Sequence, residues 1–359
     1  MRKATMLLFL LSLSGVAGLV WTHRPLLADG TETLGPPSIP IAVGTGMVAA
    51  GTGMAGQPGV IELTLPNGVT VTQVLLYWEG QMVTDVPGDN TIRINGNQIV
   101  TGALIGGQTF FFSNAAGRVF SSSFRADITN LNLIGPGHNT LVLDDLVFSR
   151  IANGAGVLVI YDDDTPHAAV AVRDGIDLAF INFPEPRRST VAQTFTFPPA
   201  PVERTASLQL LFSSVEGVLS GRDRPSAFEV TIGGVTTTFV NYLHSVDGDE
   251  WDTVNLTGTV PPGVTEVTVQ AFSRDDLNTG NLPASFAWIA AGGALHPTNP
   301  AIRIEKYTNG ADADNPNDAD VPVIAPGDPV IWTYRVTNIG TVPFAQEQVT
   351  VTDSLLGPI

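Results

Sequence analysis

The sequence predicts an all-β protein that contains two tandem copies of one β-sandwich. Short runs rich in Val, Ile, Thr and Phe alternate with turn residues, and the 359 residues include 37 Gly and 26 Pro. No segment after the N-terminus keeps a 3.6-residue apolar period. Seven segments recur in the same order, among them QVLLYWEG (73–80) with QLLFSSVEG (209–217) and TIRINGN (91–97) with FEVTIGG (228–234). Such ordered self-similarity indicates an internal duplication.

The N-terminus is typical of a secretory signal. Arg2 and Lys3 precede an apolar run that ends near Trp21, and Ala28 is a small residue suited to cleavage. Leu26 stands where a second small residue is expected, so an uncleaved anchor is the alternative. We expect residues 1–28 to be a signal peptide, no membrane span after its removal, and a secreted or cell-surface protein.

Charge and cysteine content narrow the classes of partner. Removal of residues 1–28 leaves 14 basic and 34 acidic residues, a formal charge of −20. This balance argues against a nucleic-acid partner, because phosphate binding needs clustered Lys and Arg. The chain has no cysteine although it is expected in an oxidising space, so its sandwiches must hold together without disulfides.

Proline-rich breaks and the repeat limits predict the domain order. A leader rich in Gly, Pro and Thr spans 29–59 and is either a linker or an edge strand. The predicted units then follow in this order: sandwich copy 1 at 60–183, a linker at 184–190, copy 2 at 191–295, a linker at 296–300 and a third unit at 301–359.

Each copy has room for about eight strands of ordinary length, which suits a two-sheet jelly roll. The strands alternate with a period of two, as Ile92 and Ile94 do in TIRINGN. Glu79 and Glu216 each precede a glycine in corresponding segments, so we expect them to occupy equivalent framework positions. Functional residues should instead lie where the two copies differ.

The third unit carries a specific set of motifs. They are KYTNG (306–310), DAD (312–314), PGD (326–328), WTYRVTNIG (332–340) and VTD (351–353). With these motifs residues 301–354 resemble an Ig-like repeat of bacterial cell-surface and adhesin-type proteins. The resemblance implies a structural or stalk role without catalysis. Residues 60–295 resemble, more loosely, the jelly-roll regions of prokaryotic surface proteins.

The third unit is expected to be an incomplete Ig-like sandwich. Such a sandwich needs about seven strands, whereas the segment after Pro300 has 59 residues and room for about four. Two explanations stay open: the sequence is part of a longer protein, or a strand is donated by another molecule.

Two acidic clusters are candidate Ca²⁺ sites. Alternate oxygen-bearing side chains in an extended loop can converge on one ion. The first cluster consists of Asp312, Asp314, Asn315, Asn317, Asp318 and Asp320. The second, absent from copy 1, consists of Asp247, Asp249, Glu250 and Asp252. The alternative for both is a solvated turn built from Asp and Asn.

Lys306 shares a strand face with Ile302 and Ile304, which is unusual because lysine is rarely buried unless it is paired. In adhesin sandwiches of the kind that this unit resembles, a first-strand lysine can form an isopeptide bond with an Asn or Asp of a late strand. The alternative is a lysine that extends its ammonium group to water.

Enzyme motifs are missing from the sequence: it has no H-E-x-x-H, no G-x-S-x-G and no cysteine nucleophile. We therefore expect a non-catalytic structural or adhesive protein whose partners are other cell-surface proteins or glycans. The alternative is a carbohydrate-binding module, with or without Ca²⁺, in which Trp251 contacts the sugar. An exposed Trp251 would favour sugar binding, and a buried one would favour the structural role.

Overall fold

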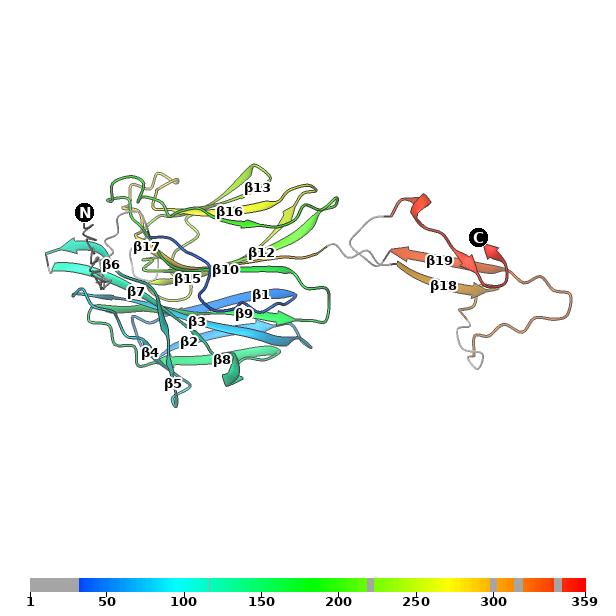
Figure 1. Cartoon of the computed structure of the whole chain (residues 1–359), viewed down its shortest axis with the longest axis horizontal. Coiled ribbons are helices and arrows are strands. Elements are labelled where there is room, and N and C mark those ends of the chain that lie inside the picture. Colours follow the sequence, from blue (N-terminus) through cyan, green and yellow to red (C-terminus); the bar gives the residue numbers. More distant parts are fainter. Residues whose placement is uncertain (1–31, 116, 218–222, 298–301, 313–318, 339–343) are drawn as a thin grey trace, which may run out of the picture.

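The computed structural model describes residues 32–115, 117–217, 223–297, 302–312, 319–338 and 344–359, and confirms an all-β fold (Figure 1). The described residues contain antiparallel strands and two short 3-10 helices, with no α-helix. The predicted signal peptide lies outside the described residues.

The first sandwich is built from two antiparallel sheets. One has the strand order β1-β9-β3-β7-β6, and the other has the order β2-β8-β4-β5. In the first sheet the strands are β1 (Gly46–Gly53), β9 (Ile151–Asp162), β3 (Thr70–Met82), β7 (Gly117–Asp127) and β6 (Ala103–Asn114). In the second they are β2 (Gly59–Leu65), β8 (Gly137–Asp144), β4 (Thr91–Ile94) and β5 (Gln98–Thr101). A short helix, η1 (Thr129–Leu131), follows β7.

Alternation of apolar and polar residues forms the core of this sandwich. In β2 the side chains of Ile61, Leu63 and Leu65 are buried, and the residues between them are exposed. Trp78 of β3 lies fully buried in the same core and stacks on Phe124 with ring centroids 5.7 Å apart. One face of each sheet therefore supplies the apolar layer between the two sheets.

The second sandwich has sheets of order β10-β17-β12-β15 and β11-β16-β13-β14. Its first sheet contains β10 (Ala169–Ala179), β17 (Phe286–Leu295), β12 (Arg204–Ser213) and β15 (Trp251–Val260). Its second contains β11 (Gln193–Thr196), β16 (Glu266–Phe272), β13 (Ala227–Ile232) and β14 (Val235–Val240). The core includes Phe212, which stacks on Trp288 at 5.5 Å.

The two sandwiches repeat one strand order. If β1 to β5 are matched with β10 to β14, and β7, β8 and β9 with β15, β16 and β17, the two pairs of sheets coincide strand for strand. Strand β6 has no counterpart. Each sandwich is therefore an eight-strand jelly roll, as the repeated segments predicted, and the first copy has one added edge strand.

Both sandwiches begin earlier than predicted. Strand β1 lies inside the segment 29–59 and is an edge strand paired with β9, one of the two alternatives for that segment, so copy 1 begins before residue 60. Strand β10 lies in the segment assigned to copy 1, yet it pairs with β17 of the second sandwich. The seven recurring segments do not include the first strand of either copy, so the sequence comparison placed both boundaries too late.

The jelly rolls stack face to face, which gives four layers of sheet (Figure 1). The sheet of β1, β9, β3, β7 and β6 contacts the sheet of β10, β17, β12 and β15 across an apolar layer, which we call the seam. Its buried residues come from both copies, for example Tyr77 and Leu158 from the first and Leu211 and Ile289 from the second. Residues of both jelly rolls therefore form one continuous block.

Polar groups add specific links across the seam. The Asn255 side chain accepts a hydrogen bond from the backbone N–H of Ala49 (3.0 Å) and donates one to its carbonyl (2.8 Å). Arg125 of β7 forms a buried ion pair with Asp174 of β10. These bonds satisfy groups that would otherwise be costly to bury.

The unit from Ile302 onward forms two small sheets. Strands β18 (Ile302–Thr308) and β19 (Trp332–Asn338) pair with each other, as do β20 (Thr352–Asp353) and β21 (Gly357–Pro358). A second short helix, η3, spans Gln346–Gln348. Ile302 and Ile304 are 49% and 54% exposed, so this unit has little buried core among its described residues.

Candidate functional site

A polar pocket opens at one end of the seam. Its volume is about 350 Å³, and residues of both jelly rolls line it: Gln81, Phe112, Arg150, Ile151, Ser214, Glu216, Arg224, Glu250 and Ser285. Its residues from the second copy follow the end of β12 or lie in the segments between strands.

Glu250 is the most perturbed group in the pocket. Its backbone has φ of 69°, a conformation that side-chain-bearing residues seldom adopt, and its carbonyl accepts a hydrogen bond from Ser214 N–H (2.9 Å). Burial raises the pKa of the Glu250 carboxyl to about 8, and the negative charge of nearby Glu216 adds to the effect. Glu250 is therefore largely protonated at neutral pH.

The pocket walls are held by arginines. Arg224 pairs with Glu216 (2.9 Å) and donates to the carbonyl of Pro283 (2.7 Å). Arg150 donates from Nε to Gln81 Oε1 (2.8 Å), and its guanidinium lies 5.1 Å from the ring centroid of Phe112. The pocket is thus lined by one acid with a raised pKa and by two guanidinium groups whose planes and donors suit oxygen-rich ligands.

Glu79 lies deeper in the seam and does not line this pocket. Ser213 and Asn153 both donate hydrogen bonds to its Oε2, the latter at 2.6 Å. Burial raises the pKa of Glu79 to about 7. The expected equivalence of Glu79 and Glu216 is wrong: Glu79 lies within β3, whereas Glu216 lies beyond the end of β12. The residue matched to Glu79 is Ser213, since each directly follows a core aromatic, Trp78 or Phe212.

The second acidic cluster does not converge on one point. Asp247 accepts a hydrogen bond from Thr253 N–H (2.6 Å), and Asp252 accepts bonds from the backbone of Ser245 (2.7 Å) and Val246 (2.9 Å). Asp249 is exposed. The carboxylates of Asp247 and Asp252 hold the loop in shape, and none of the described residues forms a metal-binding group of three or more acidic or histidine side chains.

Trp251 is fully buried, so the expectation that it contacts a sugar is wrong. The indole lies flat against glycines of the first jelly roll: a Cβ on Gly51 would lie 2.1 Å from Trp251 Nε1, and one on Gly154 would lie 2.4 Å from Cε3. Trp251 therefore anchors β15 in the seam. The sequence did not indicate this burial, because the glycines that contact the ring are about 100 to 200 residues away in the chain.

The predicted 312–320 cation loop is described only in part. Asp312 and Asp320 are exposed, whereas Asp314, Asn315, Asn317 and Asp318 lie outside the described residues. Ca²⁺ binding at this loop stays a prediction.

Lys306 is paired rather than directed only to water. Its Nζ lies 2.6 Å from Asp353 Oδ2, and Tyr334 donates a hydrogen bond to the same oxygen (2.6 Å). The Lys306 ammonium also lies 4.8 Å from the Trp332 ring centroid. The register places Lys306 opposite Tyr334 on one face of the β18–β19 pair. Among the described residues Asp353 is the acidic side chain that contacts Lys306, and the contact is that of an ion pair.

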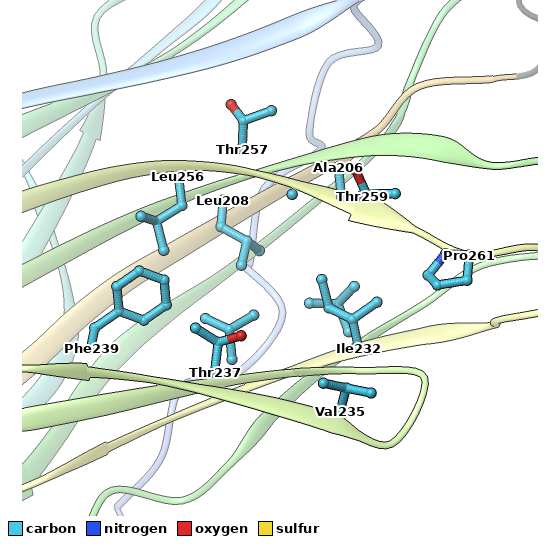
Figure 2. Close-up of a pocket in the computed structure, with 13 residues that line it drawn as sticks. Ala206, Leu208, Ile232, Val235, Thr237, Phe239, Leu256, Thr257, Thr259 and Pro261 are labelled. Carbon is cyan, nitrogen blue, oxygen red and sulfur yellow. The ribbon is translucent and has the colours of Figure 1, made fainter.

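A second, apolar pocket lies between the two sheets of the second jelly roll (Figure 2). Its volume is about 470 Å³, and it is lined by Ala206, Leu208, Val230, Ile232, Val235, Thr237, Phe239, Leu256, Thr257, Gly258, Thr259, Pro261 and Val267. Three threonines are the polar members, and none of the lining residues is charged. Neither pocket carries a sequence motif.

Comparison with known proteins gives no assignment. No family model and no curated protein matches the chain. Solved structures with similar strand arrangements include infectious bursal disease virus, Gt strain (11% identity, 73% of this chain and 75% of that chain, TM-score 0.24). Others are a Paenibacillus xanthan lyase (15%, 79% and 28%, 0.23) and the ANX1 ectodomain from Arabidopsis thaliana (10%, 76% and 96%, 0.22). These scores are too low to carry an argument about function.

In the part of the chain that the structure describes, no helix is long and apolar enough to cross a membrane.

Proposed function

We propose that the chain is a non-catalytic structural or adhesive protein of the cell surface. In this proposal the double jelly roll is a rigid block, and the unit from residue 301 is an Ig-like module attached to it. The observation that supports it most is the seam. Trp251, the residue that would have offered an exposed ring to a sugar, is instead buried in an apolar layer shared by both copies.

The cell-surface location rests on the N-terminal sequence, and two measurements test it. Fractionation of cells that express the full gene should place the protein in the envelope or the medium, and mass spectrometry should find Asp29 at its N-terminus. Retention of the chain in the cytoplasm with Met1 in place would reject export. Prolonged proteolysis of intact cells should then release peptides of the double jelly roll, because an adhesive block must face outward.

Carbohydrate binding is the second candidate, and the polar pocket at the seam is the observation that favours it. Glu250 and Arg150 offer hydrogen-bonding groups to a sugar hydroxyl in a concave site formed by both copies. Titration calorimetry with a panel of oligosaccharides should show heat with the parent chain and a loss with Glu250→Gln or Arg150→Gln. A matched variant, Glu62→Gln on the exposed face of β2, should bind like the parent. If no sugar gives heat at millimolar concentration, the pocket has no role in glycan binding.

A further inference from the structure

The apolar pocket of the second jelly roll lies at a place that the first jelly roll closes with its own chain. In the first copy the connection between β7 and β8 turns inward through η1. Ile128 and Ile134 are buried there, and Leu131 and Leu133 contact the same core. Ile128 N–H donates to Val74 O (2.9 Å), which fixes this connection beside β3. The first sandwich is thereby sealed at this edge.

Between β15 and β16 the second copy has no helix, although Val260 at the end of β15 is buried and Val264 of the following turn packs against the core. Here β15 continues straight beside β12, with Leu256 opposite Leu208 and Gly258 opposite Ala206. Gly258 lines the pocket without a side chain. The matched isoleucines show the effect: Ile94, the last residue of β4, is fully buried, whereas Ile232, the last residue of β13, is only half-buried. The space that the first copy fills is open in the second.

The strand edges at this pocket also differ between the copies. In the first copy β6 pairs with the outer edge of β7. In the second, β15 and β14 each hydrogen-bond a single neighbour among the described strands. Figure 2 shows Leu208, Leu256, Phe239 and Ile232 converging between the ribbons of these strands. The pocket is thus bordered by backbone N–H and C=O groups that can pair with an added polypeptide.

We propose that this pocket binds a polypeptide segment of a partner protein that carries closely spaced Leu and Ile side chains. The first copy identifies the chemistry, because it fills the corresponding space with Ile and Leu from a short turn of its own chain. A segment with uncharged side chains at the pocket fits, since none of the 13 lining residues is charged. A polypeptide can also pair with the free edges of β14 and β15, which a hydrocarbon chain cannot do. This inference rests on the pocket alone and does not depend on the proposed cell-surface role.

The probe is a fluorescent peptide with the sequence of residues 126–137, ADITNLNLIGPG, and binding to the full chain is followed by anisotropy. We expect saturable binding, and we expect a peptide with serine at both leucines to bind about tenfold more weakly or less, as the loss of buried apolar contacts requires. Gly258→Leu should fill the pocket, because a Cβ there lies 3.4 Å from Ile232 Cδ1. It should weaken binding by about tenfold or more.

The matched control is Thr236→Leu, which adds the same side chain at an exposed β14 position outside the pocket, and it should bind like the parent. If Gly258→Leu does not fold, Val235→Asp decides instead, since Val235 is 71% exposed at the pocket wall and its charge should abolish binding. The proposal is overturned if the peptide does not bind the parent chain, if it binds the pocket variants equally well, or if dodecanoate alone binds.

Discussion

Ser213 donates a hydrogen bond to Glu79 across the seam, and the two residues occupy matched positions in the two copies. Each follows the aromatic residue that fills its own sandwich core, and each therefore points away from that core toward the other jelly roll. The matched position thus carries an acid in the first copy and a hydroxyl in the second, and the two side chains contact each other across the seam. The contact is fully buried, and among the described residues no side chain or backbone group is within hydrogen-bonding geometry of Glu79 Oε1.

This contact predicts a pH-dependent stability. Burial raises the folded-state pKa of Glu79 from 4.5 to about 7, so between these values the folded chain holds a proton that the unfolded chain has released. The free energy of unfolding should therefore fall as pH rises from about 5 to 8, with a contribution from Glu79 of roughly 3 kcal/mol at most. Glu79→Gln should remove that part of the fall.

Urea unfolding at pH 5 and pH 8 checks this prediction. Asp177 and Glu250 also have pKa values raised to about 8 by burial, so they add to the fall in unfolding free energy. The variant must therefore be compared with the parent at both pH values, because its own change between pH 5 and pH 8 will not be zero. Glu62→Gln is the control and should keep the parental slope. An identical slope in the Glu79→Gln chain would falsify the assignment.

The buried ion pair between Arg125 and Asp174 predicts a second link between the jelly rolls. Arg125→Met leaves the carboxylate of Asp174 buried without its cation, which should cost about 3–5 kcal/mol of unfolding free energy. The double variant Arg125→Met/Asp174→Leu should recover a large part of this loss, because it leaves no uncompensated charge. Chemical denaturation of the two variants measures the difference. Equal destabilisation by both would mean that the charge pair does not set the cost.

The close packing of Gly51 and Gly154 against the Trp251 ring predicts a steric effect of substitution. Gly154→Ala places a methyl group 2.4 Å from the indole carbon Cε3 of the fully buried Trp251 ring, so the ring or the strand must shift. We expect a loss of about 1–3 kcal/mol in stability, as overpacking of a filled core requires. Gly135→Ala is the control, since its Cβ would meet no atom within 4 Å. The melting temperature should drop for the first variant and stay near the parental value for the second.

The sequence predicted the class of fold and the repeat because both depend on local patterns. Alternation in β2 and the order of matched segments are visible without any tertiary contact. The seam depends on contacts between residues far apart in the chain, such as Gly51 with Trp251, and no local pattern reports those. The same limit explains the wrong sugar-contact residue: Trp251 stands beside acidic loop residues in sequence, yet its ring is buried in the other copy.

For the acidic residues of 247–252 the sequence left a cation site and a turn as alternatives, and the hydrogen bonds favour the turn. The density of these acidic residues suggested a cation site, but Asp252 and Asp247 are engaged by backbone N–H groups of their own loop. Glu250 became the perturbed group of the seam pocket because burial and the negative charges of Glu216 and Glu79 raise its pKa, which the charge of Arg224 offsets only in part. Side-chain direction at a loop position with positive φ cannot be read from composition.

Lys306 and Asp353 predict an ion pair without a covalent bond. Hydrogen bonding to Asp353 raises the pKa of Lys306, and the same contact holds the pKa of Asp353 well below its usual range. An isopeptide bond forms by attack of a neutral amine on a protonated carboxyl with loss of water, and this pair favours the opposite protonation of both groups. Intact-mass spectrometry of the purified chain should give the full mass. A mass lower by one water, lost on Lys306→Arg, would contradict this and establish the bond.

The weakly buried unit from residue 302 predicts where proteases act first. Ile302, Ile304 and Ile331 are 49%, 54% and 63% exposed, whereas the apolar residues of the seam are almost fully buried. Burial at about 25 cal/mol per Å² offsets a backbone ordering cost of about 1–2 kcal/mol per residue only where apolar area is removed from water. Brief treatment of the full chain with a broad-specificity protease should therefore remove the C-terminal unit and leave a stable product that ends near residues 296–300. Mass spectrometry of that product locates the end, and Trp251→Ala, which loosens the seam, should make the remaining block more sensitive as well. If the C-terminal unit resists as long as the double jelly roll, its exposed isoleucines are covered in solution by a strand that the described residues do not supply.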